Sequence, residues 1–83
     1  MTKKFPCPCC GFLTFIEIPY DTFYICPVCG WEDDGAQIDD PDYKWGANNI
    51  SLNEAKIKFL DKGYIKESSI KYLRKPLEDE LPN

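Results

Sequence analysis

Histidine is absent from this sequence of 83 residues. Its absence removes the side chain that most often serves as a general base near neutral pH, and it excludes metal sites built from both cysteine and histidine. No run of apolar residues approaches the roughly 20 that a membrane-spanning helix needs. No secretory signal pattern follows the charged N-terminus, so we expect a cytoplasmic protein that does not enter a membrane.

Basic residues are missing from Phe5 to Tyr43. That stretch carries eight acidic residues, which are Glu17, Asp21, Glu32, Asp33, Asp34, Asp39, Asp40 and Asp42. From Lys44 onward the chain holds eight basic and six acidic residues, so its two halves differ in charge. Binding to a phosphate backbone depends on basic side chains, and the first half offers none. Direct binding of nucleic acid by this half is therefore unfavourable.

The five cysteines do not suit a plain disulfide framework, because their number is odd. A reducing cytoplasm also favours metal binding or redox chemistry over disulfides. All five cysteines lie in two matched segments that we call the knuckles, Cys7-Pro8-Cys9-Cys10-Gly11 and Cys26-Pro27-Val28-Cys29-Gly30. Fifteen residues separate Cys10 from Cys26, a spacing typical of four-cysteine zinc sites.

The glycine that ends each knuckle indicates which cysteines bind the metal. Glycine adopts a backbone conformation with positive φ that other residues resist, and in such a turn backbone amides can point at the sulfurs. Cys9 occupies the interior position that Val28 has in the second knuckle, so it is predicted not to bind. Four thiolates leave no open coordination position, which indicates one structural zinc ion rather than a catalytic one. The predicted ligands are Cys7, Cys10, Cys26 and Cys29.

Two other interpretations of the cysteines stay open beside zinc. Iron of the rubredoxin type is the competing metal, since similar turns hold both ions. A redox-active dithiol of the thioredoxin kind needs a strand-to-helix setting, whereas a predicted strand follows the first cysteine pair here.

Secondary structure is expected to be of the small α+β kind. Residues 12–18 are rich in aromatic and β-branched side chains and predict a strand, and residues 22–25 predict the returning strand of a hairpin that joins the knuckles. Ser51 and Glu54 form a capping-box pattern that begins a helix over residues 52–62, and Gly63 is suited to end it. A shorter helix is expected over residues 69–75.

A chain of this length forms a single domain, residues 1–83. Such a chain buries only about 60–65% of its unfolded surface, so we expect a bound metal to stabilise the fold. We divide the chain into a zinc ribbon (5–32), an acidic loop (33–50), a helical part (51–76) and a flexible tail (77–83). The predicted fold is a small zinc ribbon with one main capped helix and a short C-terminal helix.

Six carboxylates fall within eleven residues between Glu32 and Asp42. A solvated, self-repelling loop would account for them, and so would a calcium or magnesium site, although the spacing does not fit the calcium-binding helix-loop-helix motif. A face for another protein is the better functional hypothesis, because aromatic side chains lie beside the acids. Trp31 would alternatively pack in the core. The candidate contact residues are Trp31, Glu32, Asp33, Asp34, Asp39, Asp40, Asp42 and Trp45, with Tyr43 as a further aromatic.

An ordered set of motifs continues beyond the knuckles. After Cys7-Pro8-Cys9-Cys10-Gly11 and Cys26-Pro27-x-Cys29 come Trp31-Glu32-Asp33-Asp34-Gly35, Gly46-Ala47-Asn48 and Ser51-Leu52-x-Glu54-Ala55. From about Cys7 to Ala55 the chain resembles the cysteine-rich CPCC family of small bacterial proteins. The resemblance implies a domain like a zinc ribbon. The sequence departs from the family pattern at Trp45, where another glycine is expected beside Gly46.

The sequence therefore predicts a structural zinc module that binds another protein through its acidic loop and has no catalytic activity of its own. No nucleophile–base pattern points to an enzyme. Nucleic-acid binding through the basic C-terminal half is the first alternative, and electron transfer at an iron site is the second.

Overall fold

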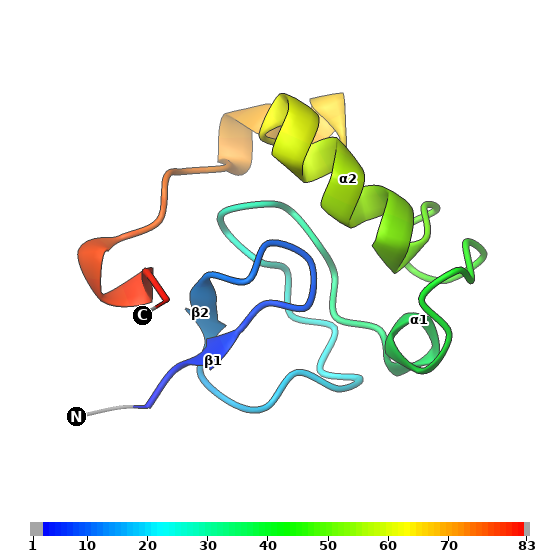
Figure 1. The fold of residues 1–83 in the computed structure, drawn as a ribbon, viewed down its shortest axis with the longest axis horizontal. Coiled ribbons are helices and arrows are strands. Elements are labelled where there is room, and N and C mark those ends of the chain that lie inside the picture. Colours follow the sequence, from blue (N-terminus) through cyan, green and yellow to red (C-terminus); the bar gives the residue numbers. More distant parts are fainter. Residues whose placement is uncertain (1–2, 83) are drawn as a thin grey trace.

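The computed structural model describes residues 3–82. A two-stranded antiparallel sheet pairs β1 (Phe5–Pro6) with β2 (Leu13–Phe15), so that Phe5 lies opposite Phe15 and Pro6 opposite Leu13. Figure 1 shows the helices arranged around the irregular chain that carries the knuckles. The predicted small α+β fold is confirmed. Its elements are β1 (Phe5–Pro6), β2 (Leu13–Phe15), α1 (Gly35–Asp39), α2 (Leu52–Lys62), and the 3-10 helices η1 (Glu67–Tyr72) and η2 (Glu78–Glu80).

The two knuckles have the same backbone conformation. In the first, the amide of Gly11 donates to the carbonyl of Cys7, and in the second the amide of Gly30 donates to the carbonyl of Cys26, both at 2.9 Å. The φ angles of the two glycines are 79° and 87°. These values lie in the left-handed region, where a side chain is strained, so the glycine of each knuckle is needed for its turn.

The strands pair differently from the hairpin that we predicted between the knuckles. Each knuckle instead reverses the chain between its own flanking segments. Thus β1 pairs with β2 around the first knuckle, and residues 23–25 pair with residues 31–33 around the second. The connecting segment cannot stay extended, because Asp21 and Phe23 have φ angles of 58° and 57°.

Helix α2 has the predicted bounds. The Ser51 hydroxyl accepts a hydrogen bond from the Glu54 amide and donates one to the Glu54 carboxylate, each at 3.1 Å. Gly63 has a φ of 81°, and its amide donates to the carbonyl of Phe59 at 2.7 Å, which ends the helix. The helix buries Leu52 and Ala55 against the core, whereas Leu60, which shares their helical face in sequence spacing, is 86% exposed.

The second helical segment is the 3-10 helix η1, which begins two residues before the predicted start. After it the chain returns to the second knuckle, where the amide of Arg74 donates to the carbonyl of Pro27 at 3.0 Å. Residues 77–82 were expected to form a flexible tail, whereas they contain η2, which lies against β2. Glu80 is buried there because its carboxylate pairs with Arg74 and accepts from the Leu77 amide. The final residue of the expected tail, Asn83, lies outside the described residues.

The core forms where the knuckles meet α2. Its largest fully buried apolar side chains are Trp31, Phe15 and Ile65, and they pack with the cysteines. Phe12 and Phe59 close one edge of the core, with their rings in an edge-to-face contact at 6.5 Å. The sulfur cluster is thus part of the hydrophobic core, so whatever holds the sulfurs together also holds the core.

Candidate metal centre

The four cysteines predicted as ligands are brought together by the fold. The sulfurs of Cys7, Cys10, Cys26 and Cys29 lie within 4.8 Å of one another. The Sγ atoms of Cys7 and Cys29 are 3.7 Å apart, and those of Cys10 and Cys26 are 3.8 Å apart. A tetrahedron with metal–sulfur bonds of about 2.3 Å has sulfur–sulfur edges of about 3.8 Å. The cluster can therefore hold a tetrahedrally coordinated metal ion.

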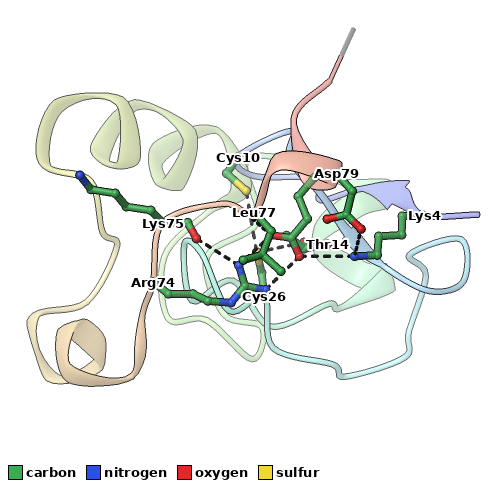
Figure 2. A network of polar contacts seen from close by, with 9 residues as sticks. Lys4, Cys10, Thr14, Cys26, Arg74, Lys75, Leu77 and Asp79 are labelled. Carbon is green, nitrogen blue, oxygen red and sulfur yellow. Dashed lines mark hydrogen bonds and ion pairs between the residues drawn. The ribbon is translucent and has the colours of Figure 1, made fainter.

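Hydrogen-bond donors surround the sulfurs. The amide of Cys9 donates to the sulfur of Cys7, and the amide of Trp31 donates to the sulfur of Cys29, both at 3.4 Å. The hydroxyl of Thr14, from the centre of β2, lies 3.2 Å from the sulfur of Cys26, as Figure 2 shows. Donors to a thiolate stabilise its negative charge. Sequence reasoning foresaw amides pointing at the sulfurs but missed Thr14, whose only signal was its place in a short strand after the first knuckle.

The thiols differ in acidity when no cation is present. The pKa of Cys26 is lowered, because its sulfur accepts hydrogen bonds from Cys10 and then from Cys29 and Cys7. The pKa of Cys10 is raised, first because its thiol donates to the Cys26 sulfur. The pKa of Cys7 is raised, first through its hydrogen bond with Cys10. Binding of a divalent cation displaces these shared protons, because the positive charge of the cation stabilises all four sulfurs as thiolates.

Three of the candidate contact residues are buried and have other roles. Trp31 is fully buried in the core. The carboxylate of Asp33 accepts from the amide and the hydroxyl of Thr22, at 2.9 and 2.7 Å. The carboxylate of Asp34 caps α1 through the amide of Ala36 and accepts from the amide of Ala47. Both carboxylates accept hydrogen bonds from backbone amides, Asp33 from the segment before the second knuckle and Asp34 within the loop, so they do not form part of an exposed acidic face.

A buried pair of amide side chains organises the loop. The side chain of Asn48 accepts from the amide of Glu32 and donates to the carbonyl of Glu32, both at 2.8 Å. It therefore makes the two hydrogen bonds that the backbone of a neighbouring strand would make. It also donates to the side chain of Gln37, whose own amide donates to the carbonyls of Tyr43 and Ile50. Sequence reasoning did not single out Gln37.

Gly46 belongs to the same arrangement. A Cβ atom at this position would lie 2.5 Å from an oxygen of Asp34 and 2.6 Å from the side chain of Gln37. The loop therefore closes over Asp34 only because position 46 has no side chain. The neighbouring Trp45, which replaces an expected glycine, has no positive φ, and its side chain is exposed.

The remaining candidates of the acidic loop lie at the surface. Asp39, Asp40, Asp42 and Trp45 are exposed, Tyr43 is partly exposed, and Glu32 is half-buried. The hydroxyl of Tyr20 donates to Asp39 at 2.7 Å, and the side chain of Asn53 donates to Asp42 at 2.9 Å. The exposed acids are thus partly held in place by neighbouring polar groups.

The fold and the sulfur cluster define a small α+β protein of the zinc-ribbon type with a four-cysteine metal-binding centre. The chain matches the sequence model of the cysteine-rich CPCC family over residues 5–80, so it belongs to that family. The match extends the resemblance seen in the motifs to the C-terminal segment. No curated protein matches the chain. Across residues 3–82, none of the helices has the length and apolar character needed to cross a bilayer.

Proposed function

We propose that this protein is a structural zinc module that binds another protein and has no catalytic activity of its own. Cys7, Cys10, Cys26 and Cys29 would hold one zinc ion, which would cross-link the two knuckles as a redox-inert tetrahedral centre. Sulfur–sulfur distances of 3.7 and 3.8 Å support this ligand set. Four thiolates complete the coordination of zinc, which supports a structural rather than a catalytic ion.

The observation that carries the binding proposal is the contrast between the two tryptophans. Trp31 is fully buried, whereas Trp45 is 75% exposed. A large aromatic side chain in solvent is typical of the anchors that dominate protein interfaces. We call Trp45 and its exposed neighbours Asp39, Asp40, Asp42 and Tyr43 the acidic face.

The loop beneath the acidic face supports the same proposal. Its backbone is held by the buried side chains of Asp34, Gln37 and Asn48, so Trp45 projects from an ordered segment. An ordered loop loses less conformational entropy on binding than a free one. The carboxylates favour a partner with a basic surface, and we place this interaction in the cytoplasm.

Two alternatives are separated from this proposal by simple measurements. An iron centre for electron transfer would have the same four ligands, so elemental analysis of the purified protein decides between one zinc and one iron per chain. A red protein with a reversible redox couple would favour iron. Nucleic-acid binding is disfavoured by the absence of basic residues from Phe5 to Tyr43, and a steep loss of affinity with added salt would favour it.

The acidic face is tested by affinity capture with three forms of the full chain. The first is wild type, the second carries Asp39→Asn, Asp42→Asn and Trp45→Ser, and the third carries Asp61→Asn and Tyr72→Ser as a control. Asp61 and Tyr72 are exposed and lie outside the acidic face. We expect the second form to lose partners that wild type and the control retain. Recovery of the same partners by all three forms would reject the acidic face.

A further inference from the structure

A groove lies on the side of the molecule where α2 ends and η1 begins. It has a volume of about 640 Å³, within the range of protein pockets that accept ligands. Figure 1 shows α2 and the segment after it running together along one edge of the molecule. The floor and walls of the groove are mostly apolar and include Phe12, Val28, Phe59, Ile70, Leu73 and Pro76.

The groove lies next to the metal centre and shares residues with both knuckles. Phe12 follows the first knuckle, and Val28 lies inside the second. The far wall is attached to the second knuckle as well, because the amide of Arg74 donates to the carbonyl of Pro27, and a Cβ atom at Gly30 would lie 3.5 Å from Leu73. The groove is therefore a fixed feature of the folded ribbon rather than a gap between loose segments.

The charged side chains at the groove are all basic. Lys62, Arg74 and Lys75 line it, and none of the described residues that line it is acidic. Within residues 3–82 the Arg74 guanidinium is paired with Glu80, whereas Lys62 and Lys75 form no ion pair. This local excess of positive charge stands out in a chain of net charge −4. The charge is opposite to that of the acidic face.

One apolar side chain at the groove is exposed to solvent. Leu60 lines it and is 86% exposed, although it belongs to the well-formed helix α2. Removing an exposed leucine side chain from water favours association. An occupant that covers Leu60 while reaching the two free lysines would satisfy both features of the groove.

We propose that this groove binds an acidic segment of a partner protein, one that carries at least two apolar side chains among glutamates or aspartates. The apolar side chains would fill the groove beside Leu60, and the carboxylates would face Lys62 and Lys75. This surface is separate from the acidic face, so the protein would contact two differently charged surfaces at once. The apolar lining argues against a phosphate backbone, which needs a row of cations rather than two.

The experiment measures fluorescence anisotropy of a labelled peptide of about 15 residues, in which leucines recur at helical i, i+3 and i+7 spacing and the other positions are mostly glutamate. A second peptide has lysine in place of every glutamate. The full metal-loaded chain is used in wild-type form and as five variants, one of which is the single substitution Trp45→Ser in the acidic face. Lys62→Glu with Lys75→Glu reverses the charge of the two free lysines, and Lys56→Glu with Lys71→Glu is the control of equal charge change at residues that do not line the groove. Leu60→Ser removes the apolar contact, and Ile57→Ser is its control, since Ile57 is exposed on α2 but does not line the groove.

We expect the acidic peptide to bind and the lysine peptide not to bind. Affinity should fall about tenfold or more for the groove double variant and for Leu60→Ser, and by less than about threefold for each control. The Trp45→Ser variant should bind the peptide as wild type does, so failure of the groove and failure of the acidic face are observed separately. Unchanged circular-dichroism spectra and metal content show that the variants are folded.

Several results would overturn the proposal. Equal binding of both peptides, or equal losses in the groove variants and their controls, would show that no specific acidic segment is recognised. A dimer in sedimentation equilibrium that Leu60→Ser dissociates would make the groove an interface between copies of this chain. Binding of dodecanoate without binding of the acidic peptide would make it a site for a small anionic amphiphile.

Discussion

Arg74 and Glu80 form a bidentate ion pair that joins the C-terminal segment to the second knuckle. The Nη1 atom of Arg74 lies 2.7 Å from Oε1 of Glu80, and Nη2 lies 2.9 Å from Oε2. Figure 2 shows Arg74 within this polar network. Glu80 also accepts from the amide of Leu77, and Lys4 lies 3.8 Å from it on the other side. Because the Arg74 backbone is bound to Pro27, the pair connects the segment before β1, the second knuckle and η2.

Replacement of Glu80 by glutamine is predicted to destabilise the folded chain by about 1–2 kcal/mol. The buried carboxylate loses its charge-assisted bonds, but Arg74 is 39% exposed and recovers part of the loss from water. Thermal or urea unfolding of the metal-loaded protein measures the change. Asp79→Asn is the control, since its ion pair with Lys4 is mostly exposed and should contribute little.

The same ion pair makes the stability of the fold depend on pH. Hydrogen bonds from Arg74 lower the pKa of Glu80 from 4.5 to about 2. A carboxyl group with a lowered pKa stabilises the fold above its unfolded pKa and loses this contribution as pH falls toward the folded value. The difference in unfolding free energy between wild type and Glu80→Gln should be constant from about pH 7 to 5 and shrink below about 4.5. A difference that stays the same down to pH 3 would contradict the role given to this pair.

Replacement of Asn48 by alanine is predicted to cost about 2–3 kcal/mol of stability. The change leaves the amide and the carbonyl of Glu32 without the partner that Asn48 supplies, and a buried unpaired polar group is costly. Asn49→Gly is the matched control, because Asn49 is exposed and its φ of 55° suits glycine. Chemical unfolding would measure both variants. Equal effects at the two positions would mean that the side chain of Asn48 does not organise the loop.

Much of the fold was predictable from the sequence, because its strongest signals are local. The two glycines of the knuckles, the capping pair Ser51 and Glu54, and the helix stop at Gly63 each act within a few residues. The choice of Cys7, Cys10, Cys26 and Cys29 as a cluster followed from such a local rule. The pairing of strands was not predictable in this way, since the connecting segment also bends at Phe23, whose residue type carries no turn signal.

The acidic loop shows why the candidate contact residues were harder to predict. Asp33 and Asp40 look alike in sequence, but one is buried against Thr22 and the other is exposed. Which carboxylates point inward depends on where distant backbone amides lie, as for Asp34 and the amide of Ala47. Charge density along the chain therefore indicated a region but not the residues that form its surface.

Loss of the metal is predicted to unfold at least the ribbon half of the protein. A structural zinc contributes about 10–16 kcal/mol in small finger peptides, which is as large as the total stability of a typical domain, about 5–15 kcal/mol. Cys29→Ser or exhaustive chelation should therefore abolish the native circular-dichroism spectrum. Cys9→Ser is the control, because Cys9 is outside the four-sulfur cluster and should leave metal content at one ion per chain. A melting curve unchanged by chelation would reject the structural role of the metal.

Replacement of Thr14 by valine is predicted to weaken metal binding while leaving the fold intact. Valine fills nearly the same space in β2 but cannot donate to the sulfur of Cys26, which lies 3.2 Å from the Thr14 hydroxyl. Removing such an outer hydrogen bond typically lowers metal affinity about 10- to 100-fold. Competition with a chromogenic chelator measures the affinity, and thermal unfolding of the loaded protein checks the fold.

Thr14→Ser separates this hydrogen bond from packing. Serine loses a methyl group but keeps the hydroxyl, so it should keep near wild-type metal affinity even though its smaller side chain lowers the melting temperature. Valine should have the opposite pattern, with weak metal binding and a smaller effect on packing. If metal affinity instead follows side-chain size, with serine weaker than valine, Thr14 acts on the centre through packing and not through its bond to Cys26.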